Sequence, residues 1–198
     1  MENLSYTICS LIFLLIIIIV YFTKQRINNV DNKIFSGIIL VNIIGAILEI
    51  LNYILINHIT TYDTFLYLIS TKFILIYYLT WDALFFSYIL AISNKEKYIK
   101  KSYTILLINS IICLFLPIEF DLKNNMCLPN GASVEFVYGI AILYITIGII
   151  IMLKNLQKNK LIKYLPFFAL IVFGTISMFV QMFQPELLMM TFVYTICI

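Results

Sequence analysis

The sequence predicts an all-α fold, a polytopic transmembrane helix bundle with six full helices and the start of a seventh. Of its 198 residues, 63% are hydrophobic and only 12% are charged, and the mean hydropathy is +1.02. Soluble domains carry about 25% charged residues, so this chain has too little polar material to cover a surface that faces water. Uninterrupted apolar runs such as LIFLLIIIIVYF favour helices over a barrel, because barrel strands alternate polar and apolar residues.

The apolar segments have the lengths that helices need to cross a bilayer, about 20 residues each. Charged and turn-forming residues fill the breaks between them, as in TKQRINNVDNK and SNKEKYIKK. We therefore expect one transmembrane helical domain over residues 1–198. Its helices are expected at about 4–22, 34–56, 65–92, 103–120, 133–153 and 164–182, with a further one beginning at Leu187.

Basic residues concentrate in alternate breaks of this pattern. Segments 24–33, 95–101 and 154–163 together contain 11 of the 13 lysines and arginines. Loops rich in Lys and Arg stay in the cytoplasm. The charge pattern therefore predicts a multi-pass protein of the cell membrane with its amino terminus outside and its seventh helix directed inward.

The seventh apolar segment is only 12 residues long, from Leu187 to Ile198. A chain that ended there would leave a charged carboxylate near the centre of the bilayer, which is costly unless it is paired or hydrated. We interpret the sequence as the N-terminal membrane part of a longer protein. The alternative is a six-helix protein with a short re-entrant tail.

Three ionisable residues, Glu49, Lys72 and Asp82, lie inside the apolar segments. Each costs about 2.5–3.5 kcal/mol at mid-membrane, so each needs a partner or a hydrated cavity. Glu49 and Lys72 are both about 10 Å below the outer surface by helix rise, and we expect them to form an ion pair. Asn42 is the nearest candidate partner for Asp82.

The second segment has a polar stripe at Asn42, Gly45, Glu49 and Asn52, whose spacing places these residues on one helix face. Such a stripe suits close packing and hydrogen bonding between helices. Internal hydrogen bonding is the structural interpretation, and a ligand pocket or switch that opens outward is the functional one. The candidate ligand or switch residues are Glu49, Asn52, Lys72, Asn42, Asp82 and Trp81.

Sequence motifs for covalent chemistry are absent. The chain has no phosphate-binding loop, HExxH or GxSxG signature, so we expect no catalytic residue, cofactor or metal ligand in it. No clustered basic surface for nucleic acid is seen. His58 is expected to be solvated in an outer loop. A Cys113–Cys127 disulfide is an option only if both residues lie near the outer face.

Several stretches resemble the membrane region of sensor histidine kinases of low-GC Gram-positive bacteria. KQRINNVDNKIFSGIILVNIIGAILEILNYI is similar to the start of that region, and STKFILIYYLTWDALFFSYILAIS is similar to its following helix. FQPELLMMTFVYTICI is similar to the last outer turn and the final helix of the family. Asp82 is not part of the family pattern.

The resemblance implies a seven-helix receptor that relays an external or membrane stimulus, such as a small molecule or peptide, to a cytoplasmic catalytic module beyond Ile198. It also implies a homodimer formed through that cytoplasmic part. Related membrane regions precede diguanylate cyclases. A small transporter or permease and a membrane scaffold are the alternatives, although transporters often have repeats and mid-membrane helix breaks, neither of which is evident in this sequence.

Overall fold

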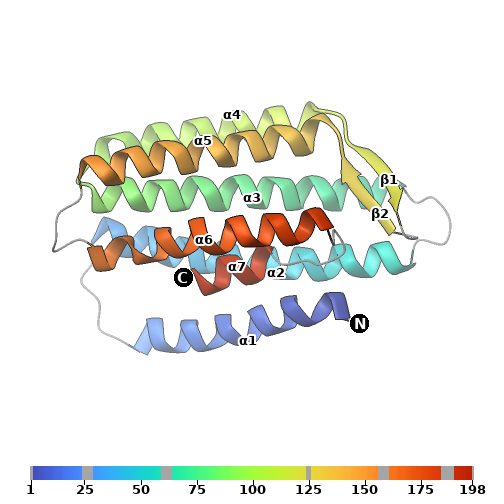
Figure 1. The fold of residues 1–198 in the computed structure, drawn as a ribbon, viewed down its shortest axis with the longest axis horizontal. Coiled ribbons are helices and arrows are strands. Elements are labelled where there is room, and N and C mark those ends of the chain that lie inside the picture. Colours follow the sequence, from blue (N-terminus) through green and yellow to red (C-terminus); the bar gives the residue numbers. More distant parts are fainter. Residues whose placement is uncertain are drawn as a thin grey trace.

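A computed structural model describes residues 2–23, 29–58, 64–123, 126–155, 161–183 and 190–197. Seven α-helices and one β-hairpin form this described part of the chain (Figure 1). The α-helices are α1 (Glu2–Thr23), α2 (Val30–His58), α3 (Thr64–Ile92), α4 (Ile99–Phe115), α5 (Ala132–Lys154), α6 (Leu161–Phe183) and α7 (Met190–Ile196). A 3-10 turn, η1 (Glu96–Tyr98), precedes α4. The strands are β1 (Glu119–Lys123) and β2 (Met126–Asn130).

The predicted all-α bundle is confirmed, with a smaller number of full spans. Within the described ranges, α1 to α5 are long and apolar enough to cross a membrane. The predicted number was six. Helix α6 is 23 residues long but is not among these five, and α7 has seven described residues.

The outward faces of the helices are apolar, which suits a hydrocarbon environment. Phe115 is 86% exposed and Phe65 71% exposed, and many Ile and Leu side chains of α1, α4 and α5 are also exposed. A soluble monomer rarely carries apolar patches of this extent. The described helices therefore have the surface of a multi-pass membrane protein.

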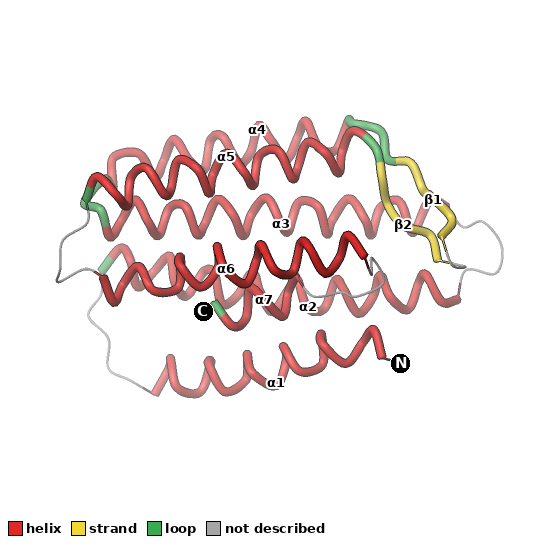
Figure 2. The backbone as a smooth tube through the Cα atoms, viewed as in Figure 1, coloured by secondary structure: helices red, strands yellow, loops and turns green. Residues whose placement is uncertain are grey.

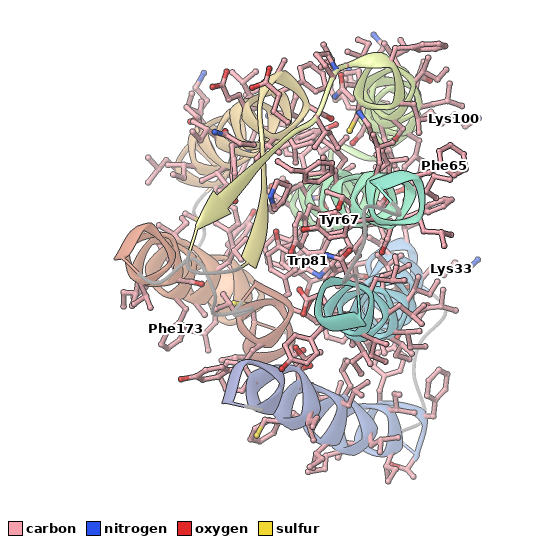
Figure 3. The ribbon with its side chains drawn as sticks, turned by 90° about the vertical axis from the view of Figure 1, so that its right-hand side faces the viewer. Lys33, Phe65, Tyr67, Trp81, Lys100 and Phe173 are labelled. Atoms are coloured by element: carbon pink, nitrogen blue, oxygen red, sulfur yellow. The ribbon has the colours of Figure 1, made fainter. Side chains whose placement is uncertain are left out.

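Helix α3 is the central helix of the bundle. About 61% of its apolar span is buried inside the protein, compared with 22% for the spans of α1 and α5. Viewed from the hairpin end, Trp81 of α3 points into the bundle, whereas Lys33, Lys100 and Phe173 point outward (Figure 3). The Trp81 ring stacks on Tyr194 of α7, with ring centroids 3.8 Å apart and planes 6° apart.

The described helix ends that flank the basic segments lie at one end of the bundle. The ends of α1, α3 and α5 that lead into residues 24–33, 95–101 and 154–163 are all at the left of Figure 2, and the hairpin is at the other end. The alternation seen in the sequence is thus a charge difference between the two ends. The direction in which the bundle crosses the membrane stays a prediction.

The largest departure from the predicted helices follows α4. This helix was expected to reach residue 120 but ends at Phe115, because the next residue, Leu116, precedes Pro117 and takes an extended conformation (φ −67°, ψ 142°). The break expected after it contains the β1–β2 hairpin, which pairs antiparallel from Glu119–Asn130 to Lys123–Met126.

The hairpin lies beside the start of α3 (Figure 3). Phe120 of β1 contacts Tyr67 of α3, with ring centroids 4.7 Å apart. Gly131 follows β2 with φ at +96°, a conformation that favours glycine, and leads directly into α5.

Candidate functional site

The Glu49 carboxylate is the centre of a buried hydrogen-bond network. Glu49 is only 1% exposed. Its Oε1 accepts hydrogen bonds from Thr191 Oγ1 at 2.5 Å and from Tyr78 OH at 3.3 Å. Its Oε2 accepts one from Thr7 Oγ1 at 3.3 Å. Because these donors come from α7, α3 and α1, one side chain of α2 ties three other helices together.

Asn42 extends the network toward the basic end of α2. Its Nδ2 donates to Thr195 Oγ1 at 2.9 Å, and its Oδ1 accepts from Tyr77 OH at 2.9 Å. The Tyr77 hydroxyl also lies 3.3 Å from Thr191 Oγ1. Two threonines of α7, one helical turn apart, are thereby bound to α2 and α3.

These contacts define what we call the α7 network, a chain of buried polar groups that joins α7 to α1, α2 and α3. Satisfied buried polar networks specify one arrangement of the elements that they join. The members of the α7 network are Thr7, Asn42, Glu49, Tyr77, Tyr78, Thr191 and Thr195.

Gly45 lets α2 and α3 approach closely enough for this network to form. A Cβ atom at Gly45 would overlap the Tyr77 ring. The predicted stripe is confirmed as one buried face, because Asn42, Gly45, Glu49 and Asn52 are all buried. Asn52 adds no bond through its Oδ1, which has no partner among the described residues.

Lys72 has a different role from the one that the sequence predicted. Its ammonium donates to the Cys113 carbonyl at 2.6 Å, to Ser133 Oγ at 3.1 Å and to the Leu116 carbonyl. The last carbonyls of a helix lack partners within the helix and attract cations. Lys72 of α3 therefore caps the end of α4 and holds the start of α5.

The predicted Glu49–Lys72 ion pair is wrong. Glu49 meets Tyr78, which is six residues beyond Lys72 on α3. Six residues correspond to about 240° around a helix and about 9 Å along it. The two charged groups therefore face different neighbours.

Asp82 and Asn42 do not form the predicted pair either. Asn42 is bound to Tyr77 and Thr195, and Asp82 Oδ2 has no hydrogen-bond partner within the described ranges. Asp82 instead borders a void of about 10 Å³, which Tyr144 of α5 and Phe167 of α6 also line.

The cysteine and histidine predictions lie partly outside the described residues. Cys113 has a free thiol whose Sγ lies 3.3 Å from Ser133 Oγ, but the side chain of Cys127 is not described. His58, expected in a loop, is the last residue of α2, and its side chain is also outside the described part.

Sequence reasoning missed the hydroxyl donors of the α7 network. Thr and Tyr are common in membrane helices, so Thr7, Tyr77 and Tyr78 gave no signal on their own. The spacing of Thr191 and Thr195 was a usable sign, because residues four apart share a helix face. A polar pair on the last helix could have been matched to the polar stripe on α2.

The arrangement binds helices together. Over the described ranges, no three His, Cys, Asp or Glu side chains lie close enough to hold a metal ion. The Glu49 carboxylate is enclosed by hydroxyl donors, so its role in the structure is to position α7.

Comparison with known proteins gives no match to any family model, any curated protein or any solved structure.

Proposed function

We propose that this chain is the membrane-embedded sensory region of a two-component signal-transduction histidine kinase. In this proposal α1 to α6 receive an external or membrane stimulus, and α7 passes it to a cytoplasmic catalytic module encoded after Ile198. The family resemblance of the α2, α3 and α7 sequences supports the proposal. The concentration of basic residues at one end supports the orientation, with α7 directed toward the cytoplasm.

The observation that carries the proposal is the polar attachment of α7. Thr191 Oγ1 lies 2.5 Å from Glu49 Oε1 and 3.3 Å from Tyr77 OH, so it has two partners on two different helices. The Thr191 hydroxyl has one hydrogen, which it donates to Glu49, and the Tyr77 oxygen can accept that hydrogen instead because Tyr77 donates its own to Asn42. In this proposal a small rotation or axial shift of α7 moves the hydrogen bond from Glu49 to Tyr77, while Glu49 keeps its hydrogen bonds from Tyr78 and Thr7. Switches of this type use helix shifts of about 1–2 Å between discrete packing states.

A stimulus acts on such an equilibrium only through its different affinity for the two states. Glu49 is the side chain of α2 through which a stimulus that displaces α2 would reach α7, because its carboxylate accepts a hydrogen bond from Thr191. Lys72 belongs to the α4–α5 side instead, because its ammonium is engaged there.

The first test is to sequence the reading frame that follows codon 198 and then to measure phosphoryl transfer by the whole protein. We expect the frame to continue into a helical segment with a phosphorylated histidine and a nucleotide-binding domain. The full-length protein in nanodiscs should incorporate label from [γ-32P]ATP into histidine. A stop codon after Ile198, a diguanylate cyclase segment or the absence of histidine labelling would refute the kinase assignment.

A second test asks whether the α7 network controls the output. Thr191→Val removes the hydroxyl that Glu49 and Tyr77 share, and it keeps the shape of the side chain. We expect a several-fold change in the basal rate of autophosphorylation. The matched control is Thr146→Val on α5, because the Thr146 hydroxyl is exposed and bonds only within its own helix. Equal rates for both variants and the wild type would remove the network from the mechanism.

A further inference from the structure

A groove between α3, α4 and α5 has the size of a ligand site. Its volume is about 490 Å³, within the range of roughly 300–1,000 Å³ typical of small-molecule sites. Ile105 of α4 and Leu143 and Ile147 of α5 line it, and each is about half exposed on the lipid-facing surface. The groove therefore opens sideways into the bilayer.

One buried polar group in this groove has no partner. Asn109 of α4 is 7% exposed and lines the groove. Its Nδ2 makes no hydrogen bond with any described residue. Tyr144 of α5 also lines the groove, but its hydroxyl has a hydrogen-bonding neighbour in Ser102. Buried polar groups nearly always have partners. The Asn109 amide therefore indicates an occupant that carries an oxygen acceptor.

The charge of the groove identifies the class of occupant. Lys95 and Lys101 line its basic end, and none of the described residues that line it is acidic. Lys101 also lies 5.7 Å from the centroid of the Tyr98 ring, which lines the same end. Basic pockets between membrane helices bind the headgroups of anionic lipids.

We propose that the groove between α3, α4 and α5 is a binding site for one anionic phospholipid of the surrounding bilayer. Its phosphate lies between Lys95 and Lys101, and one acyl chain follows the apolar wall toward Ile140. An ester oxygen accepts a hydrogen bond from Asn109 Nδ2. The Asn109 side chain suits this role, because helical Cα–Cβ bonds tilt toward the N-terminus, which in α4 is the end with the lysines. This proposal does not depend on the kinase assignment.

The charge requirement is tested by lipid titration of the delipidated protein, with native mass spectrometry as the readout. Phosphatidylglycerol and phosphatidylcholine with the same acyl chains are the two probes. The wild type should bind phosphatidylglycerol more tightly. For the double variant Lys95→Gln/Lys101→Gln we expect about 30-fold weaker binding of phosphatidylglycerol and unchanged binding of phosphatidylcholine.

The matched control is Lys33→Gln/Lys100→Gln, which removes the same charge from the same end. Both of these lysines point away from the bundle (Figure 3), and neither lines the groove. The affinity of the control for phosphatidylglycerol should stay within about threefold of the wild type, because neither of its lysines contacts the lipid in this proposal. A tenfold change would require the loss of about 1.4 kcal/mol of binding free energy. Equal losses in the two double variants, or equal affinity of the wild type for both lipids, would overturn the proposal.

The polar contact is tested separately with Asn109→Leu. This change removes a polar group that has no partner among the described residues and keeps the approximate shape, so the protein should fold. We expect it to weaken phosphatidylglycerol binding several-fold and to reduce the rise in melting temperature that this lipid produces. Unchanged affinity in this variant would refute the placement of the ester oxygen beside Asn109.

Discussion

Replacing Lys72 by Met tests the cap that joins α3 to α4 and α5. The Met side chain fills the space of the lysine stem but donates no hydrogen bond. The Cys113 carbonyl keeps a donor, because Ser133 Oγ lies 3.2 Å from it. The Leu116 carbonyl loses the donor that Lys72 provides. An unsatisfied carbonyl and a lost interaction with the helix end together cost about 2–3 kcal/mol.

A double-mutant cycle with Glu49→Gln distinguishes this cap from the ion pair that the sequence predicted. Lys72 and Glu49 share no hydrogen-bond partner among the described residues. The effects of the two substitutions on the free energy of unfolding should therefore add to within about 0.5 kcal/mol. A buried ion pair would behave differently, because breaking one costs about 3–5 kcal/mol and the second substitution then costs little.

Thermal unfolding in nanodiscs, followed by far-UV circular dichroism, measures all four proteins of the cycle. For a chain of this length, 2–3 kcal/mol corresponds to a fall in melting temperature of about 4–12 °C for Lys72→Met. The cap would be refuted if Lys72→Met melted at the wild-type temperature. A coupling energy above about 1 kcal/mol between the two sites would restore the ion pair.

Two further substitutions test the packing around the α7 network. Gly45→Ala places a methyl group against the Tyr77 ring and should cost about 1–3 kcal/mol of unfolding free energy. The control is Gly37→Ala, because its added Cβ would meet its nearest atom at 3.9 Å. Equal melting temperatures for the two variants would contradict the close approach of α2 and α3 at Gly45. Tyr194→Leu removes the ring stacked on Trp81 and should cost about 1 kcal/mol beyond lost burial. Trp81 is the one tryptophan of the chain, so its emission spectrum should change in this variant, and an identical spectrum would contradict the stack.

The bundle could be predicted from the sequence because lipid imposes few solutions on an apolar chain. Segment lengths and the absence of charges place the helices, and most observed ends lie within a few residues of the predicted ones. The end of α4 was missed because Pro117 was treated as part of a helix end. The strands β1 and β2 are separated by Asn124 and Asn125. Asparagine is a common turn residue, so this pair was a usable sequence signal for a hairpin.

The partners of the buried charges could not be predicted in the same way. Helix rise gave the depth of Glu49 and Lys72, but depth does not determine the direction in which a side chain points around its helix. The direction depends on how α2 and α3 are rotated against α4 and α7, which is a property of the packed bundle. The polar stripe on α2 was predictable because it needs only the period of one helix.

The rotation of α3 explains why the polar groups of this protein form two separate sets. Lys72 faces α4 and α5 and holds the end of α4 to the start of α5, whereas Tyr77 and Tyr78 face α2 and α7. Trp81, the next inward-facing ring, stacks on α7. A substitution confined to α4 therefore acts on the groove without touching α7. A displacement of α3 acts on both sets at once, because this one helix contributes a side chain to each.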